Sequence, residues 1–366
     1  MAEPPRIVIV GGSGVFGRLL VRETLRHTAA SVVIAGRDLG RAEEFARELD
    51  ADDRVSAQRI DLADLEQLAN AARGSFAIAC AAGPFQGLDP RLPSIAIEAG
   101  AHWLDVSDAA GWVQPLLGDH ELSRRAVERD LTILSGQSCV PALSGALARR
   151  CRAMLPSAEQ VRITLFIGNR NRKGAGAVAS ALGSGFRDPR WVGLPIGRKM
   201  AFRFESPDSV LLSDELRLKA EFRVAFELGI ANWLMFALQP LGSRLNVRWR
   251  ARLAGWLSRT AAPLSGIGSD FGCLQVESRD GSGNRAAVAL VGSGQRLAIL
   301  PIAFALRALL NGELAQRGVV SPATWLLPDE WHGHLLAAEM AWHESVSRES
   351  VSHESVSGVM PGIGQA

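Results

Sequence analysis

Short apolar runs alternate strictly with amphipathic stretches over the first 135 residues of the chain. Runs of four to six residues rich in Val, Ile or Leu and bounded by Gly, Asp or Pro predict strands. The predicted strands are Arg6–Val10, Ser31–Ala35, Val55–Ile60, Phe76–Cys80, His102–Val106 and Leu131–Leu134. The predicted helices are Val15–His27, Leu39–Leu49, Leu62–Ala72, Arg91–Ala99 and His120–Arg129. This alternation predicts right-handed crossovers and a doubly wound parallel α/β sheet of the Rossmann type, with helices on both faces.

The pattern changes after residue 140, where hairpin signals join the helical ones. We expect a helix over Pro141–Met154 with Pro as its first residue, and then a strand over Val161–Ile167. Cys273–Glu277 and Ala286–Val291 flank DGSGN, which suits an antiparallel hairpin. Residues 1–140 therefore read as the Rossmann domain, and residues 141–340 as a smaller α+β domain for substrate binding or dimerisation.

The C-terminal stretch has a low-complexity composition. It contains HESVSRESVSHESVS, a five-residue repeat that matches neither the helical period nor the heptad. This composition offers too little apolar surface to offset the entropy of ordering the chain. We predict a disordered tail over residues 341–366.

Composition excludes several classes of protein. Lys and Arg number 40 against 38 Asp and Glu, a net charge of +2, whereas nucleic-acid-binding domains carry a concentrated basic excess. The absence of Tyr excludes a tyrosine hydroxyl as proton donor. Four dispersed cysteines with no CxxC pair fit a reducing compartment, and the N-terminus lacks the apolar region of a signal peptide. We expect a cytoplasmic protein that binds no nucleic acid and, because the WHGH histidines lack a third ligand nearby, no metal.

Residues 224–259 allow two interpretations. Val224–Leu241 is nearly apolar and is followed by the basic, tryptophan-bearing run RLNVRWRARLAGWLSR. One interpretation is a helix lying at a membrane surface with its arginines at the headgroups. The other is a buried helix followed by a surface helix, as is common in globular proteins. Peripheral membrane association stays open at this stage.

A glycine-rich turn links the first predicted strand to the first predicted helix. The loop comprises Gly12, Ser13, Gly14, Val15, Phe16 and Gly17. We expect the first of these glycines to permit the tight turn, the second to admit a diphosphate, and the third to let the helix pack closely on the sheet. The amides at the start of the helix would then face the phosphates. This context predicts a dinucleotide-binding site.

Residues after the second, third and fourth strands bear on the choice of cofactor. A guanidinium at Arg37 suits the 2′-phosphate of NADP, although an inward-turned Asp38 would favour NAD. Asp61 either accepts a hydrogen bond from the adenine amino group or caps the following helix. Ala82, Gly83 and Pro84 follow the fourth strand and are small enough for the nicotinamide ribose to lie against the backbone. NADP is the expected cofactor, with NAD the less favoured one.

No catalytic signature is evident, but hydride transfer requires a proton source for the atom that gains charge. Asp105 and Asp108 follow the fifth strand, and their spacing could place both on one side of a turn, where one could hold a raised pKa. Cys139 precedes a predicted helix, a position that lowers a thiol pKa. The alternatives are helix capping for Asp108, a solvated Asp105 and an inert, buried Cys139.

The motifs GGSGVFGR, AGRD, CAAGPFQG, IEAGAHWLDVSD and GQSCVPALSG occur in an order that resembles the saccharopine dehydrogenase-like oxidoreductases. KGAGAVASAL and GVVSPATWLLPDEW extend the resemblance loosely to about residue 336. The resemblance implies an NAD(P)-binding Rossmann domain with a diphosphate loop at residues 12–17, and a C-terminal α/β domain. It assigns no catalytic residue to this chain.

Two functions are therefore compared. The first is an NADP-dependent oxidoreductase that reduces a C=N, C=O or C=C bond of a small or lipid-like substrate. A homodimer is a possible assembly. The second is a dinucleotide-binding regulatory or scaffold protein without turnover, which the missing proton donor favours.

Overall fold

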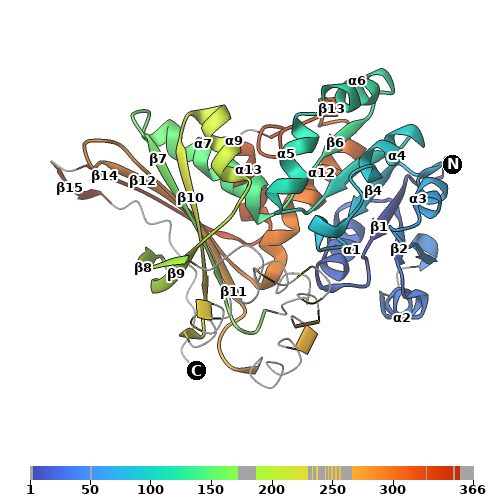
Figure 1. The fold of residues 1–366 in the computed structure, drawn as a ribbon, viewed down its shortest axis with the longest axis horizontal. Helices are drawn as coiled ribbons and strands as arrows, with labels where there is room; N and C mark the ends of the chain where they lie inside the picture. Colours follow the sequence, from blue (N-terminus) through green and yellow to red (C-terminus); the bar gives the residue numbers. More distant parts are fainter. Residues whose placement is uncertain are drawn as a thin grey trace.

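The computed structural model describes residues 3–49, 52–171, 187–229, 266–326, 328–348 and 351–354, with isolated positions between 233 and 256. The described chain forms two β-sheets. A seven-stranded sheet, here called sheet A, is built largely from the N-terminal region, and an eight-stranded sheet B comes from the rest. Helices fill the space between the two sheets (Figure 1).

Sheet A is a parallel Rossmann sheet, which confirms the predicted fold class. Its strand order is β13-β6-β5-β4-β1-β2-β3, and all its pairings are parallel. The six strands that follow one another in the N-terminal region are β1 (Arg6–Val10), β2 (Ser31–Gly36), β3 (Val55–Arg59), β4 (Ala77–Cys80), β5 (His102–Asp105) and β6 (Thr132–Leu134).

Helices cover both faces of sheet A. They are α1 (Val15–His27), α2 (Leu39–Leu49), α3 (Leu65–Ala72), α4 (Leu92–Glu98), α5 (Ala110–Leu117) and α6 (His120–Glu128). Ile7 and Ile9 of β1 join one apolar core and Val8 and Val10 join a second. Since successive side chains of a strand point to opposite faces, both faces of the sheet are buried. The sequence pattern did not predict helix α5.

A late segment of the chain returns to sheet A. Strand β13 (Gly318–Val319) pairs in parallel with β6 and becomes the seventh strand. Helix α12 (Leu300–Leu310) packs against α1. Elements within the range expected for the second domain thus contribute to the nucleotide-binding half.

Sheet B is mixed, with helices on the side that faces sheet A. Its strands are β7 (Gln160–Ile167), β8 (Arg187–Leu194), β9 (Gly197–Phe204), β10 (Lys219–Phe226), β11 (Phe271–Arg279), β12 (Arg285–Ser293), β14 (Ala341–Arg348) and β15 (Val351–Glu354). The β11–β12 hairpin is antiparallel, as predicted around DGSGN. Helices α7 (Ser144–Met154), α9 (Asp208–Leu216) and α13 (Pro328–Ala337) pack on this sheet (Figure 1).

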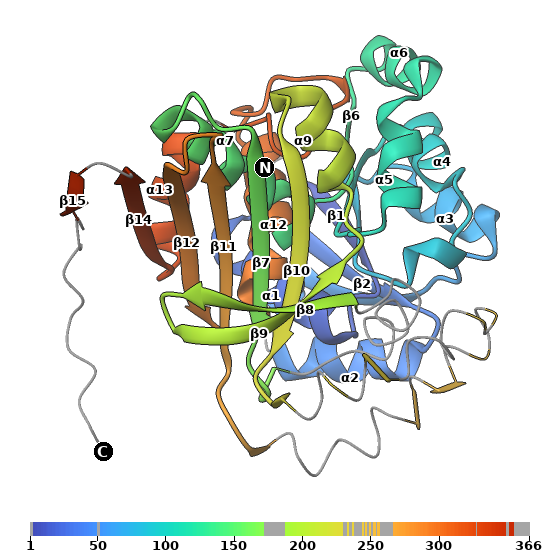
Figure 2. The ribbon, with the colours of Figure 1, turned by 60° about the vertical axis from the view of Figure 1, so that its left-hand side comes forward.

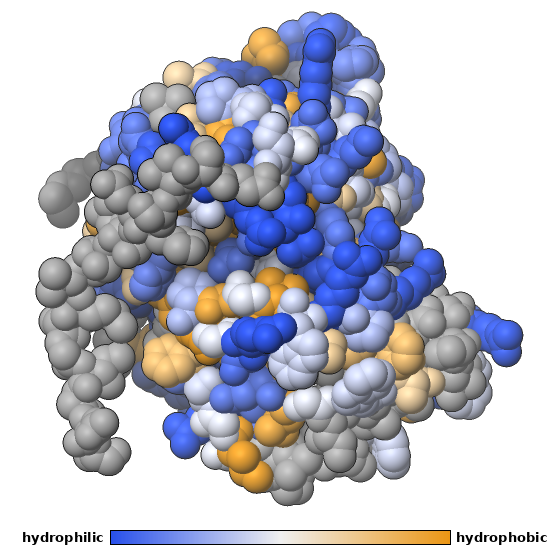
Figure 3. All heavy atoms as spheres, turned by 90° about the vertical axis from the view of Figure 1, so that its left-hand side faces the viewer, coloured by the Kyte–Doolittle hydropathy of each residue, from blue (hydrophilic) through white to orange (hydrophobic). Residues whose placement is uncertain are grey.

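The opposite side of sheet B is partly covered by its own strands. The β8–β9 hairpin crosses in front of the central strands (Figure 2), and Val192, Leu194 and Ala201 pack against Phe166 of β7. Hydrophobic residues lie among hydrophilic ones on the surface of this side (Figure 3). Trp191 is 60% exposed there.

Two expected helices differ in the structure. Pro141 does not begin the helix: α7 starts at Ser144, and Cys139–Leu143 forms a separate π-helical turn before it. Val224–Phe226, expected in a helix, belong to β10 because the backbone there pairs with β7 and β9. Most of residues 227–259, like the KGAGAVASAL motif, lies outside the described residues. Within the described part of the chain, no helix is long and apolar enough to cross a bilayer.

The predicted tail is also ordered at its start. Residues 341–348 form strand β14, whose backbone pairs with β12 from Arg285 to Val291. Trp342 and Val346 pack against the core. The ladder hydrogen bonds and these two apolar contacts stabilise a segment whose composition alone predicts disorder. Residues 355–366 lie outside the described part of the chain.

Candidate functional site

The turn after β1 takes its shape from Gly11. This residue has φ +78°, a left-handed conformation that favours glycine. A Cβ placed on it would lie 2.8 Å from the Ala82 amide nitrogen. Its own amide donates to the Ala35 carbonyl at 2.8 Å. Gly12 lies in the same tight turn, as expected: a Cβ on it would lie 2.8 Å from the Ile9 carbonyl oxygen. Gly11 adds the left-handed backbone conformation that the motif does not predict.

Close packing of α1 on this turn depends on Gly17. A Cβ there would lie 2.0 Å from the Gly11 carbonyl oxygen and 2.6 Å from the Gly12 Cα. At Gly14 the corresponding distance to the Gly11 oxygen is 3.0 Å. Both glycines thus keep the start of α1 within contact of the strand end, as the motif predicts.

The start of α1 fits a dinucleotide's diphosphate. Gly14 is the N-cap residue and no side chain caps the helix, so the amides of the first turn are open to an anion. Ser13 and Val15 lie beside this opening with partly exposed side chains, as does Phe16, whose ring also packs on the core. The main chain of this turn is not covered by Cβ atoms at its glycines, so its amides can approach a diphosphate closely.

Arg37 and Asp38 follow β2 and have exposed side chains. Asp38 Oδ1 accepts a hydrogen bond from the Arg41 amide at 3.1 Å, so this carboxylate is engaged at the start of α2. Arg37 has no ion-pair partner among the described residues. The register of β2 and β3 pairs Gly36 with Arg59, so a second exposed arginine lies on the neighbouring strand.

Asp61 does not cap α3. That helix begins at Leu65 and its cap is Asp64, whose carboxylate accepts from the amides of Glu66 and Gln67. Asp61 Oδ1 instead accepts from the Ala63 amide at 3.1 Å. The residue stays partly exposed after β3, where a contact with adenine remains a prediction.

The segment after β4 is tied to α5. Ala82 and Pro84 are partly exposed and Gly83 is exposed, while the next residue, Phe85, is buried. The Phe85 ring packs against Trp112 of α5 with centroids 5.5 Å apart. The predicted nicotinamide side of the site therefore adjoins the start of α5.

Asp105 is the centre of a buried hydrogen-bond network. Its side chain is fully buried, and burial raises the pKa of its carboxyl. The groups that donate to it, all at 2.9–3.0 Å, are Trp103 Nε1, Trp112 Nε1, Ser135 Oγ and the amides of Ser107 and Gly136. This arrangement gives Asp105 a structural role, and a solvated Asp105 is ruled out.

Asp108 and Cys139 are brought close together by the fold, since the Asp108 charge acts on the thiol. Burial, and then that charge, raise the pKa of Cys139 to about 12. The expectation of a lowered thiol pKa is therefore wrong, and the alternative of a buried, inert cysteine fits. The Asp108 side chain reaches solvent, while the protein around it raises the pKa of its carboxyl by desolvation.

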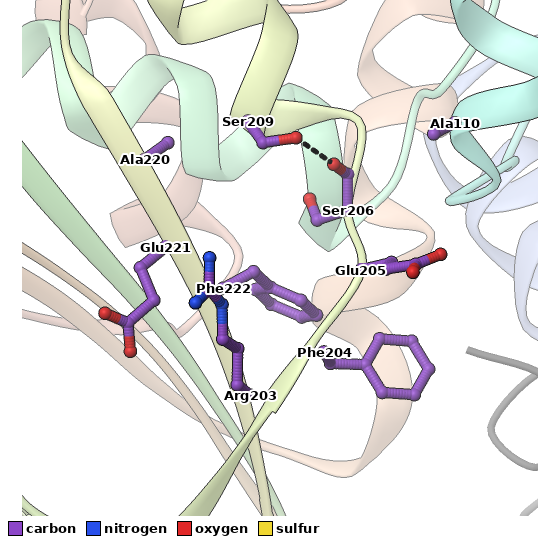
Figure 4. A pocket seen from close by; sticks show the side chains of 9 residues that line it. All are labelled: Ala110, Arg203, Phe204, Glu205, Ser206, Ser209, Ala220, Glu221 and Phe222. Atoms are coloured by element: carbon purple, nitrogen blue, oxygen red, sulfur yellow. Dashed lines mark hydrogen bonds between the residues drawn. The ribbon is translucent and has the colours of Figure 1, made fainter. Parts of the chain in front are cut away.

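A cavity of about 230 Å³ lies between α5 and sheet B, and sequence reasoning missed it. Figure 4 shows Ala110, the first residue of α5, across from residues of β9, β10 and the turn before α9. Its lining is mixed, with two phenylalanines, two serines and charged groups: Ala110, Arg203, Phe204, Glu205, Ser206, Ser209, Ala220, Glu221 and Phe222. No motif marks these residues, because they come from several elements that only the fold brings together.

The two histidines of WHGH have separate neighbours. The His332 ring packs on Trp342 with centroids 4.5 Å apart, and His334 Nδ1 lies 2.8 Å from the Arg307 guanidinium. Among the described residues, no group of three or more His, Cys, Asp or Glu could hold a metal ion.

A parallel sheet in this strand order, with a glycine turn leading into an uncapped helix, defines a dinucleotide-binding protein of the Rossmann class. Residues 7–132 match the family model described as the saccharopine dehydrogenase NADP binding domain. The resemblance is thus confirmed over these residues, which match an NADP-binding domain.

The chain is distantly similar to solved structures that include dehydrogenases. An engineered D-amino acid dehydrogenase bound to NADP⁺ is 12% identical, with 92% of this chain and 99% of that chain covered and a TM-score of 0.45. The DAP dehydrogenase of C. glutamicum in complex with DAP is 13% identical, with the same coverages and TM-score. GenD2 from gentamicin A biosynthesis in complex with NAD is 14% identical, covers 93% of each chain and has a TM-score of 0.41. At these scores the likenesses carry no argument about function, and no curated protein matches the chain.

Proposed function

We propose that the protein is an NADP-dependent oxidoreductase that reduces a C=N, C=O or C=C bond of a small or lipid-like substrate. The observation that carries the proposal is the glycine turn at Gly11–Gly17, whose missing Cβ atoms leave the start of α1 open to a diphosphate. When bound, the reduced nicotinamide supplies a hydride. The substrate would occupy the cavity beside Ala110, which the Phe85–Trp112 contact links to the end of β4.

Binding and turnover are tested separately. Fluorescence titration should show NADPH binding, and a panel of imines, ketones and enoyl esters should contain a substrate that oxidises the bound NADPH. Tight binding without oxidation of NADPH by any member would favour a regulatory or scaffold protein instead. The burial of Asp105 and Cys139, two of the three predicted proton donors, is the observation that keeps this second candidate in view.

The preference for NADP is proposed from the surroundings of Arg37. Its exposed guanidinium has no ion-pair partner among the described residues and suits the 2′-phosphate, and Asp38 Oδ1 accepts from the Arg41 amide at the start of α2. Arg37→Glu should weaken NADPH binding roughly 10- to 100-fold, since hydrogen bonds between charged groups contribute about 1.5–3 kcal/mol. NADH binding should stay the same or improve.

Arg47→Glu is the matched control. Arg47 lies on α2 and is also exposed, and its substitution changes the net charge of the protein by the same amount. Titration of both variants with both cofactors separates the effects. An equal loss of NADPH and NADH affinity in Arg37→Glu would contradict the phosphate contact.

Peripheral membrane contact through residues 224–259 is a second proposal, favoured by exposed aromatic side chains. Trp233, Trp249 and Trp256 are 50%, 55% and 60% exposed. Exposed tryptophans in a basic segment suit the interface of an anionic membrane. The protein should sediment with phosphatidylserine vesicles and less so after Trp249→Ser and Trp256→Ser; sedimentation that is unchanged by these substitutions would contradict the contact.

A further inference from the structure

A buried carboxyl lies directly behind the cavity wall. Asp208, the first residue of α9, is 1% exposed. Its only hydrogen-bond donors among the described side chains are two hydroxyls: Ser144 Oγ lies 3.0 Å from both of its oxygens, and Ser206 Oγ lies 2.8 Å from Oδ2. No cation pairs with it among the described residues. A buried carboxyl without a cation favours its neutral, protonated form.

Ser206 connects this carboxyl to the cavity. The residue lines the cavity (Figure 4), and its hydroxyl oxygen accepts a hydrogen bond from the Asp208 amide at 3.1 Å. When Asp208 is protonated, its O–H can donate to Ser206 Oγ, which leaves the serine proton free to point into the cavity. The two residues then form a short path for a proton from buried carboxyl to substrate.

We propose that Ser206 and Asp208 are the proton donor of the oxidoreductase, with Ser206 as the catalytic residue and Asp208 acting through it. This inference rests on the proposed function. As the substrate carbon gains a hydride from the reduced nicotinamide, the Ser206 O–H bond breaks and its proton passes to the substrate atom that gains charge. The Asp208 O–H bond breaks in turn and restores the serine hydroxyl. The resulting carboxylate regains a proton from solvent, so one hydride and one proton are added per turnover.

The charges around Asp208 are consistent with this role. Burial is the main influence and raises the pKa of Asp208 to about 7, against the lowering effect of the Ser206 and Ser144 hydrogen bonds. The charge of Glu215, on the same helix, raises it further. Glu215 is itself paired with Arg149 of α7. Asp208 can therefore be protonated at the start of a turnover and ionised at its end.

Infrared spectroscopy tests the pair without a substrate. The C=O stretch of protonated Asp208, identified as the band that Asp208→Asn removes, should be present at low pH and disappear as the pH rises through about 7. Ser206→Ala removes a hydrogen bond that favours the ionised form, so the midpoint should move to higher pH. Ser213→Ala, an exposed serine on the same helix, should leave it unchanged.

The infrared results can overturn the pair even if no substrate is found. Asp208 ionised at every pH, or protonated at every pH, would overturn it, because neither form could give up and regain a proton near neutrality. A midpoint that Ser206→Ala leaves in place would also overturn it. Conversely, a titrating band whose midpoint Ser206→Ala moves and Ser213→Ala does not would support it.

Turnover with a substrate from the panel adds a second readout. Asp208→Asn and Ser206→Ala should each lower kcat by about 10²-fold or more with unchanged NADPH affinity. The wild-type kcat should fall as the pH rises through about 7, since Asp208 loses its proton there, and Asp208→Asn should remove that dependence. Failure of the proposed function would appear as a wild-type protein that does not bind NADPH, or that binds it and oxidises it with no member of the panel. Failure of the proton path would appear as wild-type kcat in both variants.

Discussion

Replacing Gly17 with alanine is expected to abolish measurable NADPH binding and to destabilise the fold by about 1–3 kcal/mol or more. The new Cβ would lie 2.0 Å from the Gly11 carbonyl oxygen, and both atoms are attached to backbone that cannot simply rotate away. The start of α1 must therefore move off the strand end, and its open amides move with it. Fluorescence titration with NADPH and urea unfolding measure the two effects.

Gly333→Ala is the matched control for this substitution. Gly333 lies in α13 and has no atom within 4 Å of the position its Cβ would take. Alanine also has the higher helix propensity, so this variant should be as stable as wild type or slightly more so. Unchanged NADPH affinity in Gly17→Ala would show that the diphosphate does not lie on this turn.

Replacing Asp105 with alanine should lower the free energy of unfolding by about 3 kcal/mol or more, because each buried donor left without an acceptor costs about 1–3 kcal/mol. Five donors lose their acceptor, among them the indole N–H groups of Trp103 and Trp112. Each buried donor that is left without an acceptor destabilises the fold by the full free energy of its desolvation. Urea unfolding followed by tryptophan fluorescence measures the loss.

Asp105→Asn separates the network from simple packing. The amide keeps one acceptor oxygen and nearly the same volume, so its loss should be clearly smaller than that of alanine. A loss below about 1 kcal/mol in Asp105→Ala would contradict the structural role. Because Trp112 also packs on Phe85, NADPH affinity should fall in Asp105→Ala even under conditions where the protein stays folded.

Much of the nucleotide-binding half was predictable because its signals are local. A strand buried on both faces must be apolar throughout, as in RIVIV, and a helix must approach the strand end where glycines occur. Both requirements leave marks within a few adjacent residues. The spacing of the glycines does not reveal which of Gly11 and Gly12 takes the positive φ, and the structure assigns it to Gly11.

The roles of the proton-donor candidates are harder to predict, because the residue type does not show whether its carboxyl or thiol is buried. Asp105 and Asp108 are three residues apart, yet one is fully buried among indoles and the other reaches solvent. Cys139 precedes a helix as expected, but the desolvation of its thiol outweighs any effect of the helix on its pKa.

Residue pattern alone thus decides the Rossmann class and the glycine turn at which we propose the diphosphate to bind, because strand periodicity, helix periodicity and glycine spacing act over neighbouring residues. Tertiary structure decides what long-range pairing brings together. It adds β13 to sheet A, orders β14 against β12, and brings Ser206 to the wall of the cavity that begins at Ala110, with Asp208 behind it. The free energy of the two strand pairings comes from partners fifty or more residues away, and no local pattern can encode it.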